Sequence, residues 1–129
     1  MASYSILVTS SPFSSDSASQ AAAFCRTLVQ AQHTVDQIFF YQDGVYHANS
    51  LMSPPSDETS PYQVWLRLYE ELEIPLVVCI TAATRRGILS AQEAESVGVE
   101  GNNLQAPFTD TGLGEFFSQL HKSRYLVQF

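Results

Sequence analysis

The sequence predicts an α/β fold in three layers, α/β/α, around a parallel sheet of about five strands, flavodoxin-like in appearance. Short apolar segments alternate with segments whose apolar residues recur at helical spacing, and this alternation is typical of parallel strands connected by helices. The apolar run at residues 76–80 is bounded by Pro75 and a polar turn, as expected of an inner strand buried on both faces. The 129 residues suffice for one core and predict a single domain, 1–129.

The first part of the chain predicts two strands with a helix between them. Residues 5–9 and 35–41 are short segments rich in apolar side chains, which are typical of strands. Between them, apolar residues recur at i, i+3, i+4, i+7 and i+8, and this spacing predicts a helix over residues 17–32. Cys25 belongs to the apolar stripe of that helix, so we interpret it as a core thiol.

The longest irregular stretch of the sequence follows, from residue 42 to residue 59. Long structured loops are usually functional, and this one has apolar side chains between its polar ones. Apolar groups on a small domain need a cover, and tyrosine and methionine are enriched at interface cores. We therefore expect a subunit interface in this stretch, with four candidate residues: Val45, Tyr46, Leu51 and Met52.

The second half of the chain returns to the alternating pattern. Ser60 and Pro61 make a good start for a helix, and Ser90 with Glu93 fits a capping box that begins a short helix ending at Gly98. In chain order, the expected elements are a helix to about residue 72, the strand 76–80, a polar turn over 82–87, the short helix before Gly98, a short strand at 103–105, a helix over 113–120 and a closing strand at 125–129.

Cys79 is the most informative residue of the chain. It lies near the carboxyl end of the expected buried strand, and in open α/β sheets ligands and chemistry gather outside that end. Arg85 and Arg86 follow six and seven residues later, and a nearby cation favours the nucleophilic thiolate. Two alternatives remain open from the residues alone: Cys79 as a small buried core residue, and the arginines as a solvated or interface pair.

Composition and motifs exclude several kinds of function. The net charge of -7 and the pI near 4.7 disfavour direct binding to nucleic acid. No apolar stretch is long enough to span a bilayer and no signal-like segment begins the chain, so we expect a cytoplasmic protein without a membrane contact. Two distant cysteines argue against a disulfide framework, and the three histidines show no metal spacing. His47 is interpreted as a loop histidine. The chain also lacks a glycine-rich phosphate loop, which is the usual signal for a bound nucleotide. We therefore expect no cofactor, and the histidine spacing leads us to expect no metal.

The order and spacing of several short motifs resemble the TusD and DsrE sulfurtransferase subunits, with the closer likeness to TusD. The resemblance extends nearly from end to end. It is carried by residues 39–49 (FFYQDGVYHAN), 53–58 (SPPSDE), Cys79 with residues 82–83 and 85–87, and residues 103–104, 108 and 112–114.

This resemblance implies a three-layer DsrE-like fold and a place in a sulfur relay that feeds 2-thiolation of wobble uridine in transfer RNA. The reactive cysteine of the family falls on Cys79. It further implies TusB-like and TusC-like partner subunits in a heterohexamer, a TusA-like sulfur donor and a TusE-like acceptor. A homo-oligomer is expected when the chain is alone.

The chemistry of a persulfide carrier needs one accessible thiolate and no cofactor, because the steps resemble thiol exchange. Arg85 and Arg86 are the candidates for holding the sulfur anionic. Three alternatives belong to other classes of function: a DsrE-type subunit in sulfur oxidation, a noncatalytic module that binds a small anion, and a scaffold subunit. The last is disfavoured because a scaffold has no need for a thiol between a strand end and two arginines.

Overall fold

Five parallel strands form one sheet in the computed structural model, which describes residues 1–129. The order across the sheet is β4-β3-β2-β1-β5. Every neighbouring pair is parallel. The strands are β1 (Ser3–Val8), β2 (Thr34–Phe40), β3 (Leu76–Cys79), β4 (Phe108–Thr111) and β5 (Tyr125–Gln128). The predicted α/β fold with a parallel sheet of about five strands is therefore confirmed.

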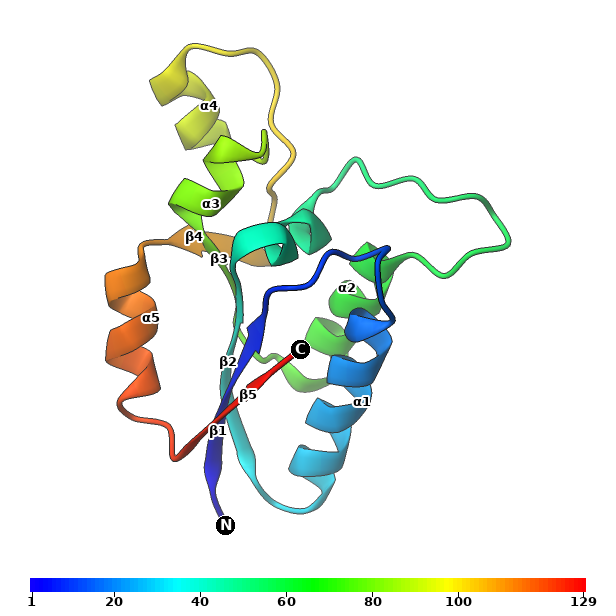
Figure 1. Ribbon diagram of the computed structural model, residues 1–129, viewed down its shortest axis with the longest axis vertical. Helices are drawn as coiled ribbons and strands as arrows, with labels where there is room; N and C mark the ends of the chain where they lie inside the picture. The colour runs from blue at the N-terminus through cyan, green and yellow to red at the C-terminus, as the bar shows by residue number, and fades with distance from the viewer.

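Helices cover both faces of the sheet, as Figure 1 shows. Helices α1 (Ser17–Gln30) and α2 (Pro61–Leu72) pack on one face, where the rings of Phe40 and Trp65 meet edge to face with centroids 5.0 Å apart. Helix α5 (Leu113–Leu120) lies on the opposite face, here called the α5 face, where Phe116 stacks on Phe39 at 4.3 Å. Alternate residues of each strand therefore belong to different layers.

The carboxyl edge of the sheet carries three further elements. These are the 3-10 helix η1 (Gln42–Ala48), α3 (Ile80–Arg85) and α4 (Ala91–Val97), which extend beyond the strand ends in Figure 1. Gly44 of η1 lies against the end of β1, because a Cβ at this position would meet the carbonyl oxygen and carbon of Val8 at less than 3.0 Å. Only glycine permits this close approach, which places η1 over the edge of the sheet.

The predicted helix starts and stops agree with the structure. Ser60 caps α2 by accepting a hydrogen bond from the backbone N–H of Gln63, and Ser90 caps α4 by accepting one from Glu93. Gly98 ends α4 in the left-handed conformation that favours glycine. None of the helices combines the length and the apolar composition that crossing a membrane requires.

Two expected elements are wrong. The strand expected at residues 103–105 lies instead at Phe108–Thr111. The reason is the side chain of Asn103, which accepts a hydrogen bond from the Leu89 N–H and donates to Asn49 and to the carbonyl oxygen of Gly87. Through these contacts Asn103 connects neighbouring loops instead of pairing in a strand. The polar turn expected at residues 82–87 is largely helical, because α3 begins directly after Cys79.

The stretch from 42 to 59 also differs from the prediction. Its first part is the 3-10 helix η1, whose turn directs Val45 and His47 into the interior, so that both are fully buried. Val45 is therefore no interface residue, because the core of this chain already covers it. His47 is not a loop histidine in contact with solvent. From Met52 to Thr59 the chain is irregular and largely exposed.

Candidate functional site

Cys79 lies where the sheet meets the helices of its carboxyl edge. It is the last residue of β3 and the residue before α3, with an extended backbone. Its sulfur is a free thiol, and the residue is 2% exposed. The predicted position at the strand end is confirmed, but the site is almost closed in the single chain. Any reaction of this thiol with a second molecule requires its surroundings to open.

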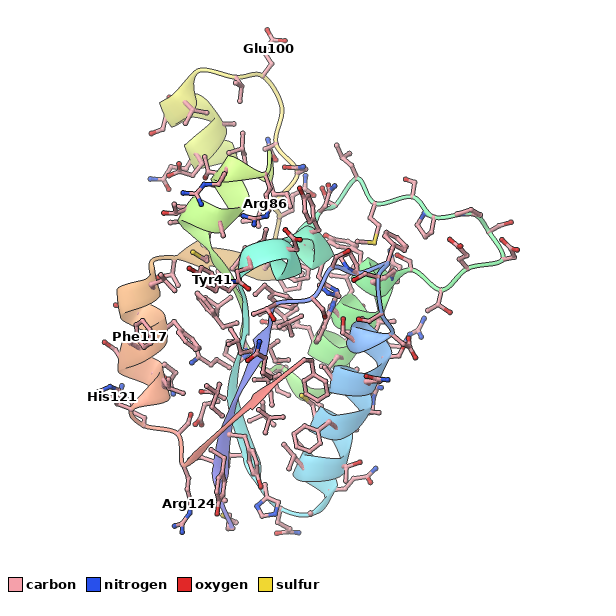
Figure 2. All side chains as sticks on the ribbon, in the orientation of Figure 1. Tyr41, Arg86, Glu100, Phe117, His121 and Arg124 are labelled. Carbon is pink, nitrogen blue, oxygen red and sulfur yellow. The ribbon has the colours of Figure 1, made fainter.

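The strand register defines the neighbours of Cys79. Cys79 pairs with Thr111 of β4, and Val78 pairs with Phe40 of β2, so the next residue, Tyr41, lies beside Cys79. The ring of Tyr41 is 6.5 Å from that of Phe39, which stacks on α5. By strand alternation, the side chains of Tyr41, Cys79 and Thr111 all belong to the α5 face. Figure 2 shows Tyr41 at the carboxyl end of β2.

The second cysteine has a different environment. Cys25 lies on the inner side of α1 and is fully buried in the hydrophobic core. Burial raises the pKa of its thiol to about 12, although the charge of Arg26 lowers it slightly. Cys25 therefore stays protonated at neutral pH, and a protonated, enclosed thiol is a poor nucleophile. The interpretation of Cys25 as a core thiol fits this environment.

Arg86 is held by η1. Its Nε donates a hydrogen bond to the Asp43 carboxylate at 3.0 Å, and its Nη1 donates to the carbonyl oxygen of Ala82 at 3.1 Å. Figure 2 shows Arg86 over η1. The side chain is 22% exposed. The ion pair thus links the end of α3 to η1, and much of the charge of Arg86 is balanced by Asp43.

Arg85 has no such partner. It is exposed, makes no ion pair, and borders a shallow hollow of about 300 Å³ together with Thr84 and Glu93. The structure brings both arginines to the carboxyl edge, on the helix that begins directly after Cys79. Their roles at the sulfur stay a prediction.

His47 joins three segments beneath the carboxyl edge. Its Nδ1 accepts a hydrogen bond from the Trp65 indole at 2.9 Å, and its Nε2 donates to the carbonyl oxygen of Ser10 at 3.0 Å. Ser17 lies 3.5 Å from the same Nε2. Burial lowers the pKa of His47 to about 4, against a smaller opposite effect of the Ser10 hydrogen bond. The imidazole is therefore neutral at pH 7 and has a structural role.

The remaining interface candidates lie near the end of η1 or within four residues after it. Tyr46 is 37% exposed and Leu51 is 71% exposed, whereas Met52 is partly buried. Tyr46 and Met52 border a groove of about 570 Å³ with Phe13, and Leu51 borders a second hollow of about 540 Å³. Cys79 borders neither hollow, so these surfaces are separate from the thiol.

The structure reveals two functional candidates that sequence reasoning did not identify. Asp43 was part of a motif, but its pairing with Arg86 joins residues 43 positions apart in the sequence. Thr111 had no local signal, because its proximity to Cys79 depends on the register of β4. No three side chains of His, Cys, Asp and Glu gather closely enough to hold a metal ion.

A parallel sheet with a free cysteine at the carboxyl end of an inner strand defines an α/β protein with a thiol site. Residues 2–129 match the DsrE/DsrF-like family, and the chain belongs to that family. It is 37% identical to the Sulfurtransferase TusD of Proteus mirabilis, over 98% of this chain and 97% of that protein. It is 36% identical to the Sulfurtransferase TusD homolog of Vibrio cholerae, over 98% of this chain and 96% of that protein.

A solved structure has the same fold. The crystal structure of the ychN protein from E. coli superposes with a TM-score of 0.75 at 17% identity and covers 100% of both chains. The family match and the curated relatives confirm the similarity to the TusD and DsrE family that was inferred above from short motifs.

Proposed function

We propose that this protein is a sulfurtransferase that accepts sulfur as a persulfide on Cys79 and passes it to an acceptor protein. The observation that carries the proposal is the free thiol of Cys79 at the carboxyl end of β3, in a chain whose relatives are named Sulfurtransferase TusD. Ligands and chemistry gather at this edge in open α/β sheets. The deeply buried Cys25 offers no comparable thiolate.

The reaction is a transfer of one sulfur atom between thiols. The Cys79 thiolate attacks the outer sulfur of a donor persulfide, a new S–S bond forms on Cys79, and the donor leaves as a thiolate. An acceptor thiolate then attacks the same outer sulfur, and Cys79 leaves as a thiolate. No electrons enter or leave the pair of proteins, so the cycle needs no external oxidant or reductant.

The burial of Cys79 fits a carrier whose cargo must be protected. A residue that is 2% exposed is shielded from free thiols, which otherwise reduce a persulfide. We infer that a docking partner opens the site at the moment of transfer. The isolated chain should therefore react slowly with bulky thiol reagents.

Arg85 and Arg86 are proposed to favour the anionic sulfur. Both lie at or next to the end of α3, which starts immediately after Cys79. A positive charge near a thiol stabilises its ionised form. Since Asp43 balances much of the charge of Arg86, the larger share of this effect falls to the unpaired Arg85.

The proposed partners are those that the resemblance to the TusD and DsrE subunits implies, and the charge of the chain is compatible with them. We propose a cytoplasmic sulfur relay that ends in 2-thiolation of transfer RNA, with TusB-like and TusC-like subunits in a heterohexamer, a TusA-like donor and a TusE-like acceptor. The net charge of -7 favours contact with proteins over direct contact with nucleic acid. A DsrE-type role in sulfur oxidation would use the same thiol and differ only in donor and acceptor.

The subunit interface is proposed at Tyr46, Leu51 and Met52. Tyr46 in η1 and Leu51 just before the irregular segment expose apolar surface, and both border hollows. Apolar groups at such positions favour burial against another chain. Cys79 borders neither of these hollows.

The test is the location of sulfur after incubation with a persulfide donor. Intact and peptide mass spectrometry should find one added sulfur atom on Cys79 in the wild type and in Cys25→Ser. Cys79→Ser should carry none. Sulfur on Cys25, or equal loading of Cys79→Ser, would refute the proposal. Binding of a small anion by Cys79→Ser with full affinity, without sulfur loading of the wild type, would support the anion-binding alternative.

A further inference from the structure

Three side chains form a row across the carboxyl edge on the α5 face. Cys79 is the middle member, with Thr111 at the end of one neighbouring strand and Tyr41 directly after the end of the other. Adjacent strands lie about 4.8 Å apart, so both neighbours are within side-chain reach of anything bound to Cys79. The position two residues earlier on each strand carries Phe39, Val77 or Thr109, which form the row below.

The two flanking hydroxyl groups are unused. No hydrogen bond within the chain involves the hydroxyl of Tyr41 or of Thr111, and both residues are partly buried. Thr111 also borders a hollow of about 510 Å³ on the α5 face, together with Val77 and Phe116. The row therefore offers two free hydrogen-bond donors, one on each side of a nearly buried thiol.

We propose that the hydroxyls of Tyr41 and Thr111 bind the outer sulfur of the persulfide on Cys79, an inference that rests on the proposed function. The outer sulfur extends one S–S bond, about 2 Å, beyond the thiol position. In the row it lies between two O–H donors from neighbouring strands. Thr111 is the last residue of β4 and Tyr41 follows the last residue of β2, so both donors are held close to the sheet, which positions a site more accurately than a loop does.

Hydrogen-bond donors at the outer sulfur would favour the transfer. Both the attacking thiolate and a persulfide anion are negatively charged, so they repel each other. Hydrogen bonds to the outer sulfur reduce its negative charge and therefore the repulsion that an incoming thiolate meets. The same bonds stabilise the persulfide until the acceptor thiolate attacks it.

The experiment compares the full-length wild type with Tyr41→Phe and Thr111→Val, which remove the hydroxyls and keep the side-chain shape. Two matched controls lose a hydroxyl elsewhere: Tyr4→Phe at the amino end of β1, and Thr109→Val two residues below Thr111 on the same strand. Thr111→Ser keeps the hydroxyl donor that Thr111→Val removes. Each variant is loaded with a low-molecular-weight alkyl persulfide, and peptide mass spectrometry measures the sulfur on Cys79 over time.

We expect Tyr41→Phe and Thr111→Val each to load about tenfold more slowly than the wild type, as for the loss of one hydrogen bond to an anion. The two controls and Thr111→Ser should load at wild-type rates. Alkylation of Cys79 by iodoacetamide should change less than about twofold in all variants, because this reagent brings no outer sulfur.

Two results would overturn the inference while leaving the proposed function intact: wild-type loading in both hydroxyl-deleted variants, or alkylation slowed as much as loading, which would place the effect on the thiol itself. Failure of Thr111→Ser to restore the rate would assign Thr111 a packing role and equally refute its binding of sulfur. If the wild type loads no sulfur on Cys79, the proposed function fails, and the inference fails with it.

Discussion

Protonation of His47 should control the stability of this protein at mildly acidic pH. The imidazole is fully buried, and its hydrogen bonds to Trp65 and Ser10 join η1, α2 and the loop after β1. The Nδ1 atom accepts a hydrogen bond, so it cannot take up a proton without losing that bond. A second proton would therefore place an unpaired charge in the core.

The magnitude follows from the shift of the pKa. Burial lowers the pKa of His47 from 6.5 to about 4 in the folded chain. Between these two values the unfolded chain binds a proton that the folded chain does not, so the free energy of unfolding falls as the pH falls. Each pH unit in this interval costs about 1.4 kcal/mol. We expect a loss of about 2 kcal/mol between pH 7 and pH 5, and full stability from this group above pH 6.5.

The assay is urea denaturation at a series of pH values from 7.5 to 4.5, followed by tryptophan fluorescence and circular dichroism. The control variant is His47→Gln, whose amide oxygen can accept the Trp65 hydrogen bond and which does not titrate. The wild type should lose stability with decreasing pH more steeply than His47→Gln, even if the variant is less stable at pH 7. Equal slopes for the two proteins would refute the assignment of His47 as a buried neutral group.

Other variants test other features of the structure. Gly44→Ala should lower the free energy of unfolding by about 2 kcal/mol or more, because its Cβ would meet the backbone of β1; an unchanged melting temperature would contradict this contact. Tyr46→Asp with Leu51→Asp should reduce the mass of the assembly in light scattering and leave the circular dichroism unchanged, and an unaltered mass would place the interface elsewhere. Arg85→Ala with Arg86→Ala should shift the iodoacetamide reaction of Cys79 to higher pH, whereas identical pH profiles would leave the thiolate to other groups.

Local physics explains why so much of the fold was predictable. Ser60, Ser90 and Gly98 mark helix ends through hydrogen bonds to nearby backbone groups or through a backbone conformation that glycine prefers, so their signals lie within a few residues. The buried strand that ends at Cys79 is equally local, since an unbroken apolar run indicates it. The position of the thiol at the sheet edge followed from these signals alone.

Contacts between segments that are distant in sequence explain why some elements and side-chain positions were predicted wrongly. His47 is buried because η1 packs over Trp65, and Asn103 ties two loops together in place of forming a strand. Val45 points inward because a 3-10 turn forms in a segment without clear periodicity. The residues joined by these contacts are far apart in sequence, and the preferences of single residues do not predict such contacts. The register that aligns Thr111 with Cys79 has the same origin.

The two arginines of the site are unequal for a reason that begins at Gly44. Because this residue has no Cβ, η1 lies directly on the end of β1, and the preceding residue, Asp43, comes within 3.0 Å of Arg86. A charge paired this closely acts at a distance as a dipole, whose field falls faster than that of a single charge. Arg85 keeps its full charge but is exposed, so salt weakens its effect on Cys79. Any charge effect of the arginine pair on the sulfur should therefore come mainly from Arg85 and decrease at high ionic strength, while Arg86 chiefly fixes α3 against η1.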